Sequence, residues 1–193
     1  TMNGLRWLAI AGLSLLCVSG AAAQNYPTRP VTIVVPYAAG GGTDLLARMV
    51  AQKLEQRLGK SFVVENRPGG GTVIAALAVA KAPADGYTLL MGTSTPLAIN
   101  ATLHKKLPYN PATDFVPLAL VANVPFVLVV NPSQPIKSAS DLVELAKEKP
   151  GSLSYGTSGP GSPHHLFAEL FKSMTGIEMT HVPYKGSVPA LTD

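Results

Sequence analysis

Two short segments rich in glycine and hydroxyl residues are the places in this sequence where chemistry could occur. The first is 36–44, with the sequence PYAAGGGTD, and the second is 156–162, with the sequence GTSGPGS. Each follows a strand pattern and precedes a helix pattern, so each should join the carboxyl end of a strand to the amino end of a helix. Ligands bind at such ends in open α/β sheets, and the N–H groups of a first helical turn favour an anion there. Facing each other, the two loops could hold both ends of a small dicarboxylate.

A structural interpretation of these loops stays open beside the functional one. Thr43 and Ser162 are residue types that cap helix N-termini, and glycine-rich turns often only connect elements. Asp44, in the first turn of its helix, could stabilise the helix dipole, lock the loop or accept an ammonium group of a ligand. No arginine stands in either loop, which favours recognition of an anion by backbone N–H groups and hydroxyls.

The patterns of common enzyme and metal sites do not fit. A dinucleotide-binding fingerprint would need glycine in place of Leu45, and no P-loop is present. Pro160 breaks a G-x-S-x-G nucleophile elbow around Ser158. The adjacent pair 164–165, two histidines, would point about 100° apart on a helix, and no H-E-x-x-H pattern occurs. We expect no catalytic residue, no metal and no cofactor; the alternatives are a secreted serine hydrolase that uses Ser158 with a histidine and a secreted scaffold without a ligand.

The elements that must position the loops alternate between strand and helix patterns. This alternation predicts an α/β fold with mostly parallel sheets. The expected strands are 31–35, 61–65, 87–91, two apolar runs within 116–130, 153–155 and 178–182. The expected helices are one that ends before Gly59, 72–81, 138–149, one from Pro163 that ends at Gly176, and one that begins near 188.

Details of the pattern predict helix faces and helix ends. Ser138 and Asp141 have the spacing of a capping box, and Pro163 suits the first helical position. The helix before Gly59 should pack through Leu45, Leu46, Met49, Val50, Leu54 and Leu58, and the helix from Pro163 through Leu166, Phe167, Leu170, Phe171 and Met174.

The first 23 residues predict a secretory signal peptide that is cleaved after Ala23. Arg6 precedes a short apolar run, and small residues follow it. Cys17 and Trp7 lie in this segment, so the mature protein would have neither residue type and no disulfide. Because Arg6 would be removed with this segment, the formal net charge would fall from +4 to +3. Lysines and arginines are not clustered, so we expect no nucleic-acid partner.

Five ordered motifs resemble those of the Bug family, the TctC solute-binding receptors of tripartite tricarboxylate transporters. They lie at 36–44, 65–71, 84–90, 155–162 and 181–186 and have the sequences PYAAGGGTD, ENRPGGG, ADGYTLL, YGTSGPGS and HVPYKG. The resemblance implies a bilobed, periplasmic-binding-protein-like (type II) α/β fold with two parallel-rich sheets flanked by helices. The lobes would comprise 24–120 and 121–193. Because members of the family run well past 193, we expect this chain to be part of a longer protein.

The resemblance also implies a function without catalysis. A periplasmic, monomeric receptor would close its interlobe cleft on a small carboxylated solute and deliver the solute to membrane permease subunits. The turn 184–186, with the sequence YKG, would lie near the cleft. The ligand-binding residues implied, by loop position or by the resemblance, are Tyr37, Ala38, Gly40, Gly41, Gly42, Thr43, Asp44, Asn66, Ser94, Thr157, Ser158, Gly161, Ser162 and His165.

Overall fold

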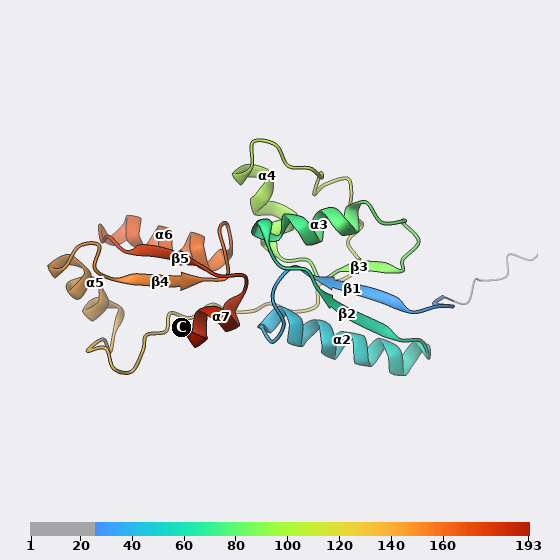
Figure 1. The fold of residues 1–193 in the computed structure, drawn as a ribbon, viewed down its shortest axis with the longest axis horizontal. Helices are drawn as coiled ribbons and strands as arrows, with labels where there is room; N and C mark the ends of the chain where they lie inside the picture. The colour runs from blue at the N-terminus through green and yellow to red at the C-terminus, as the bar shows by residue number, and fades with distance from the viewer. Residues whose placement is uncertain (1–25) are drawn as a thin grey trace, which may run out of the picture.

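The computed structural model describes residues 26–193, which form two α/β units lying side by side (Figure 1). The predicted signal peptide, 1–23, lies outside the described residues. The first unit contains β1 (Val31–Val35), α2 (Gly42–Leu58), β2 (Phe62–Asn66), the turn η1 (Gly70–Thr72), α3 (Val73–Ala80), β3 (Thr88–Leu90), η2 (Thr95–Ile99) and α4 (Asn100–Leu103). The second unit contains α5 (Ala139–Glu148), β4 (Ser154–Thr157), α6 (Pro163–Thr175), β5 (Thr180–Pro183) and α7 (Ser187–Thr192).

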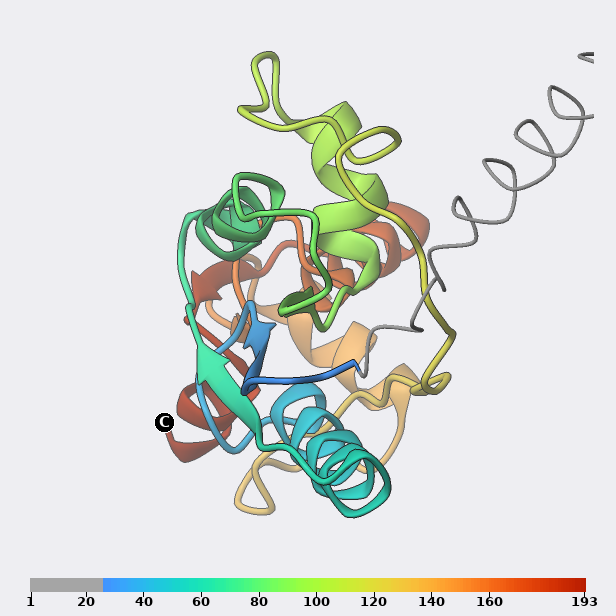
Figure 2. The ribbon, with the colours of Figure 1, turned by 90° about the vertical axis from the view of Figure 1, so that its right-hand side faces the viewer.

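The sheet of the first unit is parallel, with the strand order β2-β1-β3. Val31 pairs with Phe62, and Thr32 pairs with Thr88 on the other side. Helices α2 and α3 cover opposite faces of this sheet, as the two views in Figures 1 and 2 show. Because β1 is central and covered on both faces, its sequence VTIVV is almost continuously apolar.

Helix α2 packs on the sheet through smaller residues than the sequence predicted. Ala47 and Ala51 are buried, with Val50 and Leu54 half-buried against the same core. Leu45 and Met49, which belong to the predicted face, are 55% and 64% exposed, so this part of the prediction is wrong. The alanines let the helix axis approach the strands closely, and this turns the larger neighbours toward solvent.

The second sheet consists of two parallel strands, β4 and β5, paired from Ser154–Thr180 to Thr157–Pro183. The predicted capping box of α5 is confirmed, because the Asp141 N–H donates to the Ser138 hydroxyl at 3.2 Å and the Ser138 N–H donates to the Asp141 carboxylate at 3.0 Å. The α/β fold with parallel sheets is confirmed in both units.

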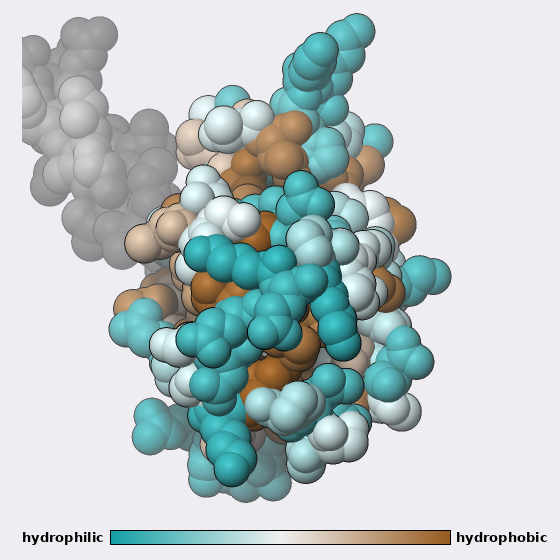
Figure 3. Space-filling model, turned by 90° about the vertical axis from the view of Figure 1, so that its left-hand side faces the viewer, coloured by the Kyte–Doolittle hydropathy of each residue, from teal (hydrophilic) through white to brown (hydrophobic). Residues whose placement is uncertain are grey.

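Helix α6 exposes the face that was predicted to be buried. Phe167, Leu170 and Met174 are 53%, 55% and 78% exposed, and no α6 residue is buried. The sheet beneath has only two strands and does not cover the whole width of the helix. Figure 3, which views the molecule from the end formed by the second unit, shows apolar patches between hydrophilic side chains.

The apolar segment 116–130 forms no strand, so the prediction of two strands there is wrong. Many of its side chains point to solvent, with Val116, Leu120 and Val127 each about four-fifths exposed, whereas Phe126 packs edge-on against His164 and Phe167 of α6. A strand requires a neighbour whose N–H and C=O groups pair with its own, and neither described sheet pairs with this segment. The prediction of strands here depended on composition alone, whereas a strand forms only where its backbone pairs with that of a neighbouring strand.

Candidate functional site

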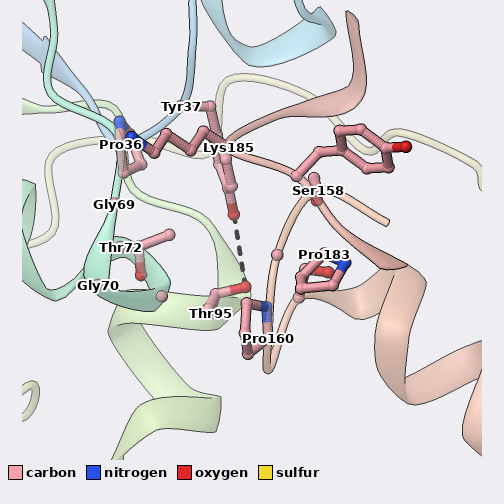
Figure 4. Close-up of a pocket in the computed structure, with 14 residues that line it drawn as sticks. Pro36, Tyr37, Gly69, Gly70, Thr72, Thr95, Ser158, Pro160, Pro183 and Lys185 are labelled. Carbon is pink, nitrogen blue, oxygen red and sulfur yellow. Dashed lines mark hydrogen bonds between the residues drawn. The ribbon is translucent and has the colours of Figure 1, made fainter. Parts of the chain in front are cut away.

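A cavity of about 190 Å³ lies between the two units, where the loops after β1, β2, β4 and β5 converge (Figure 4). These loops follow the carboxyl ends of parallel strands, the position at which α/β sheets bind ligands. The lining residues are Pro36, Tyr37, Gly69, Gly70, Gly71, Thr72, Thr95, Ser158, Gly159, Pro160, Ser162, Pro183, Tyr184 and Lys185.

The first unit contributes oxygen atoms to the cavity wall. Figure 4 shows the Tyr37 side chain extending to Thr95 at the far end of the cavity. The Tyr37 hydroxyl lies 3.0 Å from the Thr93 hydroxyl and donates to the Thr95 hydroxyl at 3.4 Å. These bonds fix the ring, and because the Tyr37 proton goes to Thr95, the Thr95 hydroxyl is the one that can donate onward to an anion.

Four successive residues with positive φ form another part of this wall. The φ angles of Gly69, Gly70, Gly71 and Thr72 are 114°, 57°, 59° and 75°. A β-branched residue in the left-handed region is strained, and such strain persists where the surroundings impose it. Here the buried Asn100 amide imposes it by donating to the Gly71 carbonyl at 2.9 Å and to the Thr72 hydroxyl at 3.3 Å.

The second unit contributes the loop between β4 and α6. Ser158, Gly159 and Pro160 line the cavity, and the Thr157 side chain turns behind them. Ser162 ends the loop as the N-cap of α6, where its hydroxyl accepts a hydrogen bond from a backbone N–H at 3.3 Å. The loop therefore shows both interpretations at once: it caps a helix and it faces a cavity.

Ser158 forms the side-chain contact that a serine hydrolase would need. Its hydroxyl lies 2.8 Å from Nδ1 of His164. Within residues 26–193, however, no carboxylate is hydrogen-bonded to His164, so the imidazole lacks the acid that orients the base in a catalytic triad.

The N–H groups beside Ser158 do not form an oxyanion hole. Those of Gly159, Gly161 and Ser162 each donate to an acceptor within the second unit, at 3.2 Å in all three cases. Pro160 has no N–H group. The loop thus offers hydroxyls rather than a pair of backbone donors, and an acyl-transfer transition state would find no preorganised stabilisation there.

Lys185 is the cationic side chain of the cavity wall. It follows β5, and its side chain extends across the cavity toward Pro36 of the first unit (Figure 4). Among the described residues no carboxylate lies within ion-pair distance of it, and no aspartate or glutamate lines the cavity. The wall therefore combines one positive charge with several hydroxyls, a composition suited to a small anion.

The loop after β1 joins the two units rather than lining the cavity beyond Tyr37. The Ala38 N–H donates to the Lys185 carbonyl at 3.1 Å. A Cβ atom on Gly41 would lie 3.1 Å from the Ser187 hydroxyl, and one on Gly186 would lie 3.2 Å from the Ala38 side chain. Small residues on both sides let the units approach this closely.

Asp44 and Asn66 lock this loop from behind. The buried Asp44 carboxylate accepts from the Gly40 N–H at 2.9 Å, from Nε of Arg48 at 3.0 Å and from the Asn66 amide at 2.9 Å. The same Asn66 amide donates to the Tyr37 carbonyl at 3.0 Å. Burial alone would raise the pKa of Asp44, but the hydrogen bonds from Arg48, Gly40 and Asn66 outweigh it and hold the pKa below its usual value. Of the roles open for Asp44, the geometry shows the structural lock.

The structure places the predicted site residues in three groups. Tyr37, Ser158 and Ser162 line the cavity. A second group lies within the loops or behind them. The third group is Ser94 alone, which is exposed and lies outside the wall, next to the lining residue Thr95. The second group contains Ala38, Gly40, Gly41, Gly42, Thr43, Asp44, Asn66, Thr157, Gly161 and His165. Helix α2 begins at Gly42 with Gly41 as its N-cap, so Thr43 is not a cap.

The set of ligand-binding residues predicted from the sequence omits several residues of the cavity wall. The omitted residues include Thr72, Thr95, Lys185 and the glycine turn 69–71. A signal for this turn was present, since it follows a strand and precedes a helix as the other two glycine-rich loops do. The family resemblance did place the turn 184–186 near the cleft, but nothing in the sequence marked Lys185 as the charge of the cavity wall.

The described residues form neither a metal-ligand cluster nor a membrane-spanning helix. Residues 26–193 contain no group of three or more histidine, cysteine, aspartate or glutamate side chains placed to hold a metal ion. In the same part of the chain, no helix has both the length and the apolar character needed to cross a bilayer.

Two α/β units that meet at a cavity lined by hydroxyls and one lysine are typical of two-lobed solute-binding proteins. Within this class the chain belongs to the TctC family, because residues 46–193 match the sequence profile described as the tripartite tricarboxylate transporter family receptor. The resemblance inferred from the five motifs is thereby confirmed.

Characterised relatives and solved structures agree with this assignment. Protein BugT of Bordetella pertussis is 42% identical over 196 residues, covering 100% of this chain and 60% of that protein. Rpa4515 of R. palustris, solved with adipate, is 50% identical with a TM-score of 0.85 over 87% of this chain and 56% of that one. MatC (Rpa3494) of Rhodopseudomonas palustris, with bound malate, is 34% identical and has a TM-score of 0.81. This match covers 86% of this chain and 57% of that one. The chain thus spans a little more than half the length of these proteins.

Proposed function

We propose that the protein is the periplasmic receptor of a tripartite transporter, which binds a small carboxylate in the cavity between lobes 24–120 and 121–193 and delivers it to membrane permease subunits. One observation carries the proposal: the cavity presents hydroxyls and the Lys185 ammonium, and no carboxylate side chain lines it. An anion gains a charge-assisted hydrogen bond there and meets no like charge. Adipate and malate in two related structures support a carboxylate as the ligand.

Both lobes would contact one ligand. Tyr37 and Thr95 come from the first unit, whereas Ser158 and Lys185 come from the second. A ligand that touches both walls stabilises the arrangement in which they are close, and this is how a receptor signals occupancy to a permease. The ligand-binding roles of the deeper loop residues, such as Gly42 and Thr43, stay a prediction.

A panel of carboxylates tests the proposal on the full-length protein. We expect adipate, malate or another small dicarboxylate to raise the melting temperature, because a ligand that binds only the native state stabilises it, by about 2.7 kcal/mol at a hundredfold excess over Kd. Calorimetry on each hit should give one site per chain. The uncharged diamide of the best acid is the matched control and should not shift the melting temperature. If no carboxylate shifts it, a receptor for carboxylates is the wrong function.

The Ser158 contact with His164 makes a hydrolase the second candidate. We expect no hydrolysis of p-nitrophenyl acetate above the rate of Ser158→Ala, because the site lacks an orienting acid and an oxyanion hole. The measurement is release of p-nitrophenolate at pH 8, with His104→Asn as a control for hydrolysis by a surface imidazole. Turnover that disappears in Ser158→Ala alone would favour the hydrolase.

A further inference from the structure

Two histidines stack behind the second cavity loop. His165 belongs to the first turn of α6 and His181 to β5, and their ring centroids lie 4.1 Å apart with the planes inclined by 13°. Neither ring lines the cavity. The stack therefore supports the loop from the protein side and leaves the ligand side open.

Each ring contacts one end of the stretch that faces the cavity. Nδ1 of His165 accepts a hydrogen bond from the Gly161 N–H at 3.2 Å. Nε2 of His181 lies 2.7 Å from the Thr157 hydroxyl, which in turn accepts from the Gly159 N–H at 3.2 Å. Since the cavity-facing residues 158–160 lie between these two contacts, the stacked pair fixes the loop at both ends.

The contact made by His165 depends on its protonation state. A backbone N–H can only donate, so Nδ1 must be unprotonated to accept from Gly161. A proton on Nδ1 would place two donors against each other and break this bond. The bond of His181 survives protonation, because its Nε2 can donate to the Thr157 hydroxyl as well as accept from it.

The surroundings of His181 disfavour its charged form. Burial, then the neighbouring His165 and Lys172, lower the pKa of His181, while Glu169 opposes them. Two imidazolium rings in contact would repel each other, so the stacked pair takes up one proton more readily than two. Because the bond from Gly161 needs an unprotonated Nδ1, a proton on His165 is the one that would alter the loop.

The other titratable groups around the stack are Tyr155, Glu169 and Lys172. Tyr155 stacks on His181 at 5.1 Å, and its hydroxyl donates to Glu169, which also accepts from Lys172 at 2.7 Å. These hydrogen bonds, the one from Lys172 first, lower the pKa of Glu169. Burial and then Glu169 raise the pKa of Tyr155.

The carboxylate that follows α7 is engaged elsewhere. Asp193 accepts a hydrogen bond from the Tyr184 hydroxyl. Imidazole is thus the group type here that changes charge in the neutral range.

We propose that His165 and His181 are positioning residues of the binding loop, and that protonation of His165 frees Gly161 and lowers the affinity for a carboxylate at acid pH. The inference rests on the proposed function, since it concerns the regulation of the same site. The added positive charge would attract an anion, but the His165 ring does not line the cavity, and the loop lies between the ring and the cavity. The loss of the loop geometry therefore outweighs this attraction, and the affinity for a carboxylate falls at acid pH.

The test measures adipate affinity of the full-length protein by calorimetry at pH 7.5 and 5.5. We expect the wild type to bind about fivefold more weakly at pH 5.5, the effect of losing one hydrogen bond. His165→Asn keeps an acceptor near the position of Nδ1 but cannot be protonated, so it should bind as tightly at pH 5.5 as at 7.5. His165→Phe keeps a stacked ring without an acceptor and should bind weakly at both pH values.

Two comparisons separate this inference from its alternatives. His104→Asn removes a histidine that forms no hydrogen bond or ring contact with the stacked pair, and it should keep the pH dependence of the wild type. An equal pH dependence in His165→Asn, or tighter binding of the wild type at pH 5.5, would overturn the proposal, because the proton would then act elsewhere.

A second measurement does not depend on any ligand. The Gly161 amide resonance of the wild type should shift between pH 7.5 and 5.5, whereas that of His165→Asn should stay constant. If adipate fails to bind at pH 7.5 but the Gly161 resonance titrates, adipate is the wrong ligand, while the effect of His165 protonation on Gly161 is supported. A Gly161 resonance that does not titrate in the wild type contradicts this coupling between His165 and Gly161.

Discussion

Replacing Lys185 by methionine is expected to weaken binding of adipate to the full-length protein by about 10- to 100-fold. Methionine keeps the apolar length of the side chain but removes the charge that the cavity wall offers. A hydrogen bond to a charged group contributes about 1.5–3 kcal/mol, and each 1.4 kcal/mol is a factor of ten in affinity. Isothermal calorimetry at moderate salt measures the change directly.

Controls show whether the charge acts locally. Lys147→Met changes the net charge equally on an exposed face of α5 and should leave the affinity unchanged. Lys185→Arg should retain part of the affinity, because the charge stays while the donor geometry differs. Binding by the wild type should weaken with added salt more than binding by Lys185→Met. Equal affinities of Lys185→Met and the wild type would mean that the ligand does not contact the ammonium group.

The second large effect is expected for Asp44→Ala, which should lower the free energy of unfolding by about 3 kcal/mol. The substitution removes a buried carboxylate that accepts from Gly40, Arg48 and Asn66 and leaves these donors without their shared acceptor. Arg48 is half exposed and can regain hydration, so the loss falls at the lower end of the range for broken buried ion pairs. Urea denaturation at pH 7 measures it.

The effect of Asp44 should depend on pH with a defined sign. Its pKa in the folded protein is lowered, so its contribution is complete above the ordinary carboxyl pKa of about 3.9 and disappears as pH falls through the folded-state value. The difference between the wild type and Asp44→Ala should therefore shrink below pH 4. Asp141→Ala, at the exposed capping box of α5, is the matched control and should cost clearly less than Asp44→Ala. A loss at Asp44 no larger than that at Asp141 would contradict a buried lock.

The parts of the fold that were predicted correctly depend on local chemistry. The run VTIVV forms β1, Ser138 and Asp141 form their capping box, and Pro163 begins α6. In each case a few adjacent residues determine the conformation through side-chain shape or a short hydrogen bond. Both loops that were predicted to carry chemistry do follow strands at the cavity, for the same local reason.

The errors concern features that depend on distant residues. Segment 116–130 has the composition of a strand, but pairing requires a neighbouring strand edge. Leu45 and Met49 have helical spacing, yet the sheet contacts the alanine face of α2. Likewise, Thr95 rather than Ser94 lines the cavity because the packing of η2 sets its rotation, which adjacent hydroxyl residues do not reveal.

Lys185 divides two tasks between its backbone and its side chain. Its carbonyl accepts the Ala38 N–H and so joins the lobes, whereas its side chain forms part of the cavity wall. A substitution at this position therefore leaves the bond between the lobes in place, since every residue type has the same carbonyl. Position 185 can therefore change the charge of the cavity wall while the backbone bond that joins the two units is retained.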